Sequence, residues 1–329
     1  MTPPRLSLAA YVDGVLGGDT TILARAITLV ESERAADADV AAALLDAVLP
    51  HAGRSRRIGI TGVPGVGKST LIDALGVYLV RERGERVAVL SVDPSSPISG
   101  GSILGDKTRM ERLALEEAAY IRPSSSRGFL GGVARHTRET ILLCEAAGFG
   151  TILVETVGVG QSETAVRSMT DFFLLLLLPG AGDLLQGIKR GIIEMVDAIA
   201  ITKADGDMQA LAARARGEYE AALHLFPASA SGWHAPVVTC SAITPSGVAE
   251  IWALVLDHRA RMEANGHLAS RRRAQSVAWM LELVRADLDI AFRTHTRVAD
   301  ALPALEAAVA EGRTTAFAAA RHLLALFRE

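Results

Sequence analysis

The stretch GVPGVGKS, residues 62–69, fits the pattern G-x-x-x-x-G-K-[ST]. The apolar run before it, RIGIT (57–61), predicts a strand, and TLIDALGVYLV (70–80) after it predicts a helix. Glycine adopts backbone angles that are closed to other residues, so consecutive N–H groups can point into one anion-sized hollow, and the helix N-terminus adds partial positive charge. We therefore predict that this loop binds the phosphates of a nucleoside triphosphate.

Two residues at the end of the loop have predicted roles of their own. Lys68 should reach the β and γ phosphates, and the hydroxyl of Ser69 should be a ligand of Mg²⁺. The predicted nucleotide-binding residues of the loop are Gly62, Val63, Pro64, Gly65, Val66, Gly67, Lys68, Ser69 and Thr70.

Strand, loop and helix patterns alternate around this loop, from Arg57 to about Ala264. The alternation predicts an α/β fold of the P-loop class, with a mostly parallel central sheet and helices on both of its faces. The predicted strands are RIGIT (57–61), RVAVLSV (86–92), AYIR (119–122), TILVE (151–155), FFLLLLL (172–178), DAIAIT (197–202) and PVVTC (236–240).

Sequence with helical spacing flanks this region on both sides. We therefore expect three parts, which are an N-terminal helical extension (1–52), a P-loop domain (53–264) and a C-terminal helical arm (265–329). Composition leaves open whether the C-terminal segment pads the core of one domain or forms an arm for self-association.

Bulk composition excludes several classes of partner. The net charge of −3, from 34 Lys and Arg against 37 Asp and Glu, is too small to indicate nucleic acid or an anionic membrane. The run FFLLLLL is far shorter than the roughly 20 apolar residues of a spanning helix, and we expect no signal peptide. Cys144 and Cys240 lack C-x-x-C spacing. We predict a soluble, cytoplasmic protein with two reduced thiols.

The segment VETVGVGQSE (154–163) could be a dinucleotide loop or the sensing end of a nucleotide triphosphatase. It lacks a third glycine at the dinucleotide spacing and follows a later strand of the sheet, which favours the sensor. There the N–H of Gly158 could bind the γ-phosphate, and this hydrogen bond would be lost when the γ-phosphate is hydrolysed. Glu155 should meet the magnesium shell, either directly or through water. Gln161 is either the residue that orients the attacking water or a surface glutamine.

The segment ITKADGD (201–207) matches the guanine-reading pattern [N/T]KxD. The Asp205 carboxylate can accept two hydrogen bonds from guanine that adenine does not offer, and the stem of Lys203 can lie along the base. Further along the chain, Ser241 and Ala242 could place a backbone N–H near the guanine O6. Together with the phosphate loop, these residues favour GTP over ATP. Thr202 stands where asparagine is commoner, and we expect it to loosen the bracing of the loop and lower nucleotide affinity.

Four charged residues lie in glycine-rich segments that could close over the nucleotide. In VDPSSPISGGSILGDKTRM (92–110), Asp93 is expected in the Mg²⁺ shell rather than as a helix cap, and Asp106 near the phosphates rather than in a solvated charge pair. Arg109 could neutralise phosphate charge. In PGAGDLLQGIKRG (179–191), Lys189 could reach the nucleotide or a partner, but the residues alone favour a solvated lysine.

With these residues collected, the chain resembles the MeaB/MMAA-type (ArgK-type) P-loop GTPase chaperones of cobalamin-dependent acyl-CoA mutases. The matching stretches cover most of residues 57–245; they are GITGVPGVGKSTLIDAL, SVDPSSPISGGSILGDKTRM, IRPSSSRGFLGGVARHT, ILVETVGVGQSE, LLPGAGDLLQGIKRGI and TKADGD.

The resemblance implies roles for individual residues. It makes Ser69, Asp93, Asp106 and Glu155 the metal residues. It places Arg109 in a first switch and residues 158–163 in a second. Lys189 falls in a third switch that senses the mutase, which moves it toward a functional role. The residues implied for catalysis are Lys68, Asp93, Asp106, Arg109, Glu155, Gly158, Gln161 and Lys189. Thr202 departs from the asparagine that is usual in the family.

The resemblance also implies a function. GTP binding and slow hydrolysis, stimulated by the partner, would gate the loading of adenosylcobalamin into a mutase and the removal of inactivated cofactor. The implied partners are the mutase, the adenosyltransferase that supplies the cofactor, and a second copy of the chain through the C-terminal arm. No cobalamin site is expected in the chain itself, because the pattern DxHxxG is absent from the sequence.

Two other functions are compatible with a P-loop GTPase. A metal-delivery GTPase would need a His-rich or C-x-x-C tract, whereas the eight histidines are scattered and the two cysteines are isolated. A kinase acting on a transport protein would need an acceptor site, and the guanine pattern counts against it. The sequence does not indicate which mutase is the client.

Overall fold

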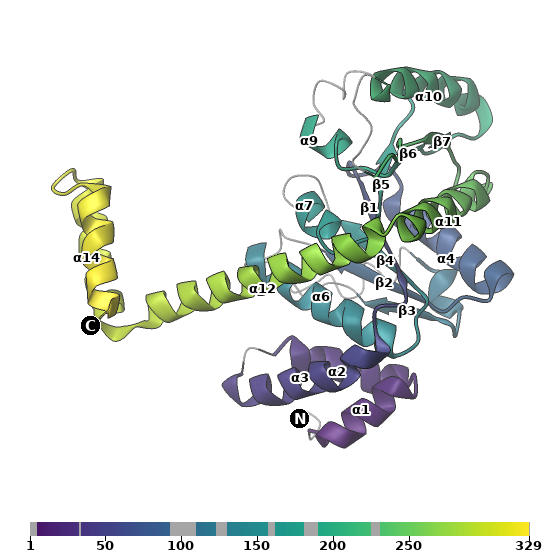
Figure 1. Cartoon of the computed structure of the whole chain (residues 1–329). Coiled ribbons are helices and arrows are strands. Elements are labelled where there is room, and N and C mark those ends of the chain that lie inside the picture. Colours follow the sequence, from purple (N-terminus) through teal and green to yellow (C-terminus); the bar gives the residue numbers. More distant parts are fainter. Residues whose placement is uncertain are drawn as a thin grey trace. The chain divides into compact units, whose positions relative to one another are not determined.

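The computed structural model describes residues 5–32, 34–92, 110–122, 130–156, 162–180, 190–224 and 231–328. The chain divides into two compact units, Met1–Arg272 and Arg273–Glu329. Each unit is described by itself below (Figure 1).

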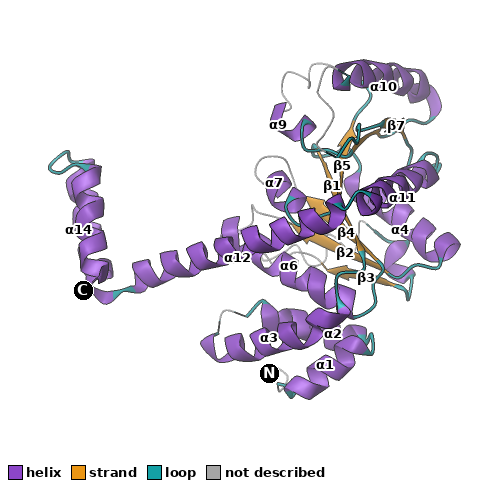
Figure 2. Ribbon diagram, in the orientation of Figure 1, coloured by secondary structure: helices purple, strands orange, loops and turns teal. Residues whose placement is uncertain are grey.

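A seven-stranded sheet forms the centre of the first unit, and every pair of neighbouring strands is parallel (Figure 2). The strand order is β3-β2-β4-β1-β5-β6-β7. The strands are β1 (Arg56–Gly62), β2 (Val87–Val92), β3 (Ala119–Arg122), β4 (Thr151–Thr156), β5 (Phe172–Leu177), β6 (Ala198–Ile201) and β7 (Val237–Thr239). The α/β fold with a parallel sheet flanked by helices is therefore confirmed, and each strand end either coincides with the predicted one or differs from it by one residue.

Helices cover both faces of the sheet, because alternate strand residues point to opposite sides. On one face, Val89 and Leu153 pack with residues of α4 (Lys68–Arg83) and α11 (Val248–Ala264). On the other face, Leu90 and Val154 pack with α6 (Leu130–Ala146), α7 (Ser162–Arg167) and α10 (Gln209–Leu223). All six residues of β5 are buried, which explains its unbroken apolar sequence. The remaining elements are η1 (Leu49–His51), η2 (Leu113–Leu115), α9 (Arg190–Ile193) and η3 (Gly206–Met208).

The N-terminal helices α1 (Leu8–Leu16), α2 (Thr20–Val30) and α3 (Ala35–Val48) extend one of these two layers. Their buried residues, such as Leu23 and Leu44, belong to the same apolar cluster as Leu143 of α6 and Ile152 of β4. The carboxylate of Asp19 caps α2 by accepting hydrogen bonds from the N–H groups of residues 21 and 22 at 2.8 and 3.0 Å. The predicted three-part division of the chain stays a prediction.

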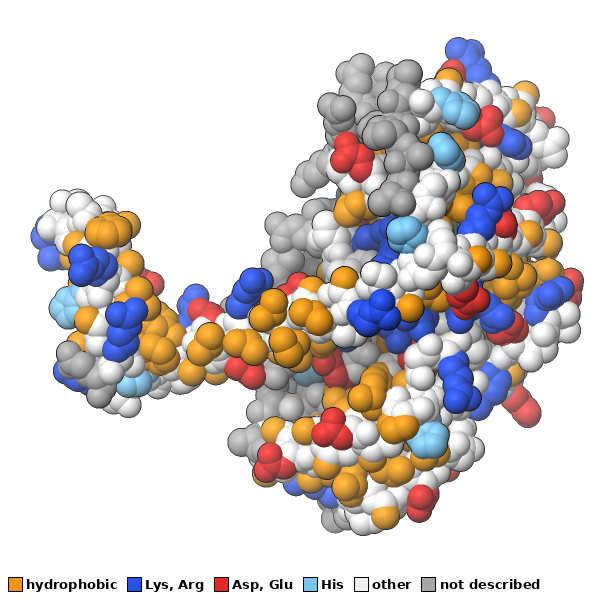
Figure 3. All heavy atoms as spheres, viewed as in Figure 1, with side chains coloured by type: hydrophobic (Ala, Val, Ile, Leu, Met, Phe, Trp, Pro, Cys, Tyr) orange, Lys and Arg blue, Asp and Glu red, His pale blue; other side chains and the backbone are white. Residues whose placement is uncertain are grey.

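The second unit consists of the greater part of α12 (His267–Thr294) together with α13 (Thr296–Ala310) and α14 (Ala316–Arg328). Phe327 of α14 packs edge-on against Phe292, with ring centroids 5.4 Å apart. Apolar side chains lie exposed along α12 at helical spacing, as Figure 3 shows; they include Val277, Met280, Leu281, Val284 and Leu288. Among the described residues, no helix is both long and apolar enough to span a membrane.

Candidate nucleotide-binding site

The predicted phosphate loop connects the carboxyl end of β1 to the first turn of α4, at the edge of a parallel sheet where ligands of such folds bind. Gly62 has a φ of 153°, and a Cβ there would lie 2.6 Å from the carbonyl oxygen of Leu176 on β5. Gly65 and Gly67 have φ values of 78° and 99°. A side chain is thus excluded at Gly62 by close packing, and glycine is favoured at the other two positions by the left-handed backbone.

Lys68, the first residue of α4, is buried at 8% exposure. Its ammonium group donates to the carbonyl oxygens of Gly62 at 2.7 Å and Val63 at 3.3 Å. The positive charge is therefore held against the backbone of the loop itself, where the phosphates of a nucleotide are expected.

Ser69 and Glu155 come from different elements, 86 residues apart in sequence, and meet beside the loop. The hydroxyl of Ser69 donates to Oε1 of Glu155 at 2.9 Å, and Glu155 is buried at 4% exposure near the end of β4. Two of the four predicted metal ligands are thus brought together as hard oxygen donors. A carboxylate and a hydroxyl in this arrangement fit Mg²⁺, which binds few protein oxygens and keeps several waters.

A side-chain contact between β1 and β4 was not predicted from the sequence. On the opposite face of the sheet from Glu155, the hydroxyl of Thr156 donates to the hydroxyl of Thr61 at 2.9 Å, and both threonines are fully buried. The pair joins the ends of the two strands just before the phosphate loop and the VGVGQ segment begin. Two threonines at the end of apolar strands were the only signal in the sequence.

The loop after β6 is tied directly to the phosphate loop. The hydroxyl of Thr202 donates to the carbonyl oxygen of Val66 at 2.7 Å and lies 3.2 Å from that of Leu177. Thr202 is buried at 5% exposure. The sequence predicted that a threonine here would loosen the loop. In the structure, the hydroxyl of this threonine itself braces the loop.

The predicted base-binding residues gather where β6 and β7 end. The N–H of Ala204 donates to the carbonyl of Cys240 at 3.0 Å, which places the TKAD and CSA segments side by side. Lys203 has a left-handed φ of 56° and an exposed side chain, and Asp205 is half-buried. The buried hydroxyl of Ser241 stabilises the loop after β7 by accepting hydrogen bonds from the N–H groups of residues 243 and 244 at 3.2 and 3.3 Å.

Ala242, which follows Ser241, is half-buried in the same loop. Burial raises the pKa of the neighbouring Cys240 thiol to about 12, so this thiol stays protonated. The remaining predicted residues lie outside the described residues; they are Asp93, Asp106, Arg109, Gly158, Gln161 and Lys189.

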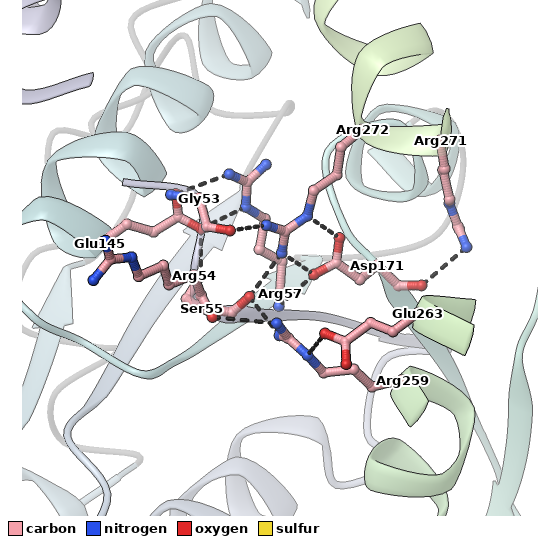
Figure 4. Close-up of polar contacts among 10 residues, drawn as sticks. All are labelled: Gly53, Arg54, Ser55, Arg57, Glu145, Asp171, Arg259, Glu263, Arg271 and Arg272. Carbon is pink, nitrogen blue, oxygen red and sulfur yellow. Dashed lines mark hydrogen bonds and ion pairs between the residues drawn. The ribbon is translucent and has the colours of Figure 1, made fainter. Parts of the chain in front are cut away.

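A separate polar cluster occupies the opposite, amino-terminal edge of the sheet (Figure 4). Arg272, in the first turns of α12, binds Asp171 through two hydrogen bonds of 2.8 and 2.5 Å. Arg57 binds Glu145 of α6 through two hydrogen bonds of 2.8 Å. Burial raises the pKa of Glu145, but the hydrogen bonds and charge of Arg57, with Ser55 and Gly53, outweigh it and hold the pKa below its usual value. Two arginines of this cluster thus form ion pairs with carboxylates of the same unit, so these charges stabilise the fold.

A parallel α/β sheet, a glycine loop with left-handed backbone between its first strand and helix, and a lysine and serine at the helix start define a P-loop nucleotide-binding protein. The sequence model of the family described as "Methylmalonyl Co-A mutase-associated GTPase MeaB" matches residues 23–297. The chain belongs to the MeaB family of P-loop GTPases, and the resemblance inferred from its motifs is confirmed.

Individual relatives agree with this assignment. GTPase ArgK of Escherichia coli is 49% identical over 274 residues, covering 83% of this chain and 82% of that protein. The mitochondrial methylmalonic aciduria type A homolog of Mus musculus is 45% identical over 325 residues, covering 96% and 78%. Among solved structures, an LAO/AO transport system kinase superposes with a TM-score of 0.78 at 36% identity and full coverage of both chains.

Proposed function

We propose that this GTPase is a chaperone that gates the loading of adenosylcobalamin into a cobalamin-dependent acyl-CoA mutase, protects the loaded enzyme and helps to reactivate it. The observation that carries the proposal is the family match over residues 23–297, whose description names a mutase association. It spans the phosphate loop, Glu155 and the TKAD segment. The name of the mouse relative, which refers to methylmalonic aciduria, supports the same client class.

The described side chains support GTP as the ligand. The amides of residues 62–69 and the Lys68 ammonium bind the phosphates, and Asp205 accepts hydrogen bonds from the guanine edge. Ser69 and Glu155 hold Mg²⁺, with Asp93 and Asp106 assigned to the same shell. The ion, when bound, neutralises charge on the β and γ phosphates. Hydrolysis is slow in the free protein and faster when the mutase is bound.

The remaining parts of the proposal concern assembly and location. The chain acts in the cytoplasm as a homodimer, and the apolar side chains exposed along α12 support self-association through the C-terminal segment. The adenosyltransferase that makes the cofactor is a second partner, from which the loaded cofactor passes to the mutase. Lys189 and the segment around it sense the mutase.

The decisive experiment measures GTP turnover with and without purified candidate mutases. We expect slow phosphate release from the protein alone and a rise of at least about tenfold with its client. A pull-down from cell extract with GTPγS and with GDP should retain the same mutase in a nucleotide-dependent way. GTP turnover that ignores every cobalamin enzyme, together with no such enzyme in the pull-down, would refute the chaperone role and leave the GTPase intact.

A further inference from the structure

Ser91 is the penultimate residue of β2, in the otherwise apolar sequence VAVLSV. It is buried at 4% exposure, and its hydroxyl has no hydrogen-bond partner. Among the described residues, it is the one serine or threonine whose buried hydroxyl lacks a partner. Buried polar groups are nearly always paired, so an orphan of this kind calls for a group that joins it in another state, such as a water or an ion.

The position of Ser91 places its hydroxyl beside the predicted magnesium ligands. Ser91 is paired in register with Glu155 on the neighbouring strand β4. Val89 and Leu153 pack against α4, and two residues further along each strand Ser91 and Glu155 point to the same face. The Glu155 carboxylate on this face already accepts the hydrogen bond of Ser69. The orphan hydroxyl is therefore on the side of the sheet where the metal ligands gather.

We propose that Ser91 is a positioning residue of the magnesium shell, and that its hydroxyl binds a water molecule held between Ser91 and Glu155 when nucleotide and Mg²⁺ are bound. The inference rests on the proposed GTP and Mg²⁺ binding. It follows from the chemistry of the ion, which keeps several waters when one or two carboxylates bind it. Removing a group that holds such an outer ligand commonly lowers metal affinity by about 10- to 100-fold.

The test is a Mg²⁺ titration of the release of a fluorescent GDP analogue from the full-length protein, with Ser91→Ala compared with the wild type. We expect the Mg²⁺ concentration for half-maximal retention to rise about tenfold. In excess chelator the two proteins should release the analogue at the same rate, because the hydroxyl acts through the metal shell.

Thermal unfolding of the nucleotide-free proteins gives a second readout with a diagnostic sign. Removing an orphan hydroxyl should leave the unfolding midpoint of Ser91→Ala unchanged or raise it, whereas removing a paired one lowers it. Ser55→Ala is the matched control, because its buried hydroxyl donates to Glu145 at the opposite edge of the sheet. We expect it to lower the midpoint and leave the Mg²⁺ dependence unchanged.

The pair Ser91→Thr and Ser91→Val separates hydrogen bonding from packing, because the two side chains have nearly the same shape. Only the valine variant should need the higher Mg²⁺ concentration that is expected for Ser91→Ala. An unchanged titration in Ser91→Ala, with wild-type binding intact, would overturn this inference alone. A wild-type protein that binds no guanine nucleotide would overturn the proposed function and the inference together.

Discussion

The two edges of the parallel sheet use charged side chains in different ways. At the amino-terminal edge, carboxylates bind arginines, as Asp171 binds Arg272 and Asp197 binds Arg167 at 2.8 Å. At the carboxyl-terminal edge, Lys68 donates to backbone carbonyls and Glu155 accepts from a hydroxyl. Ion pairs that are buried and doubly hydrogen-bonded hold a structure together. Contacts with carbonyls and a hydroxyl, such as these described ones, are of the kind that a bound phosphate or cation can replace. Among the described contacts, the difference therefore separates an edge for stability from an edge for binding.

The largest effect should come from breaking the amino-terminal edge. Asp171→Ala leaves Arg272, whose side chain is only 16% exposed, without its carboxylate. Loss of one partner of a buried pair costs about 3–5 kcal/mol, and denaturant unfolding measures it. The exposed pair of Asp257 and Arg261 on α11 is the control, because Asp257→Ala should cost less than about 0.5 kcal/mol. If GDP affinity of the folded Asp171→Ala protein falls as well, the two edges are not separate.

Lys68→Ala tests the carboxyl-terminal edge. We expect GTP turnover to fall by about 100- to 1000-fold, as when one group that stabilises transition-state charge is removed. The midpoint of denaturant unfolding should change little, because the ammonium group of Lys68 contacts only carbonyls of the phosphate loop among its described hydrogen bonds. Phosphate release under saturating GTP measures the effect, and Arg214→Ala, on the exposed face of α10, is the control. Turnover within threefold of the wild type would remove Lys68 from the catalytic residues.

Acid should act on the amino-terminal edge through Glu145. Because its pKa is lowered in the folded state, Glu145 contributes stability that is fully present above its unfolded pKa of about 4.3. That contribution is lost as the pH falls below this value and through the folded pKa. The unfolding midpoint, measured from pH 7 to pH 3, should therefore fall less steeply in Glu145→Gln than in the wild type. Parallel curves for the two proteins would contradict the assignment.

Much of the binding edge could be predicted from the sequence, because local patterns encode it. The glycines of the phosphate loop follow one another within eight residues, and each buried strand is a short apolar run between turns. Glu155 was expected in the magnesium shell, as Ser69 was, because it ends a later strand of the sheet, and the structure brings the two within 2.9 Å.

The amino-terminal cluster could not be predicted, because its contacts are distant in sequence. Arg272 and Asp171 are 101 residues apart, and the basic run RRR (271–273) reads equally well as a solvated surface. The same holds for Thr202, which reaches a carbonyl 136 residues away. Side-chain pairing across a fold depends on packing that no local pattern specifies. The orphan hydroxyl of Ser91 was likewise hidden inside an apolar strand.

The smallest predicted effect concerns GDP affinity and Thr202, at the carboxyl-terminal edge of the sheet. Thr202 fixes the carbonyl of Val66. Because a trans peptide places C=O and N–H on opposite sides, the N–H of Gly67 points away from Thr202, and we expect it to face the phosphates of a bound nucleotide. Thr202→Val keeps the shape and removes the donor, so GDP affinity should fall about fivefold, while Thr202→Ser should retain it.

Calorimetry with GDP and GMP locates the origin of that loss. If Thr202 acts through the phosphate loop, Thr202→Val should weaken GDP more than GMP, because GMP has no β-phosphate to lose. Equal weakening would place the effect in the base loop instead. Thr202→Asn tests the sequence-based expectation that threonine lowers affinity, which predicts tighter GDP binding by the asparagine variant. Because the threonine hydroxyl already holds Val66, we expect the variant to gain less than about threefold, within one ordinary hydrogen bond.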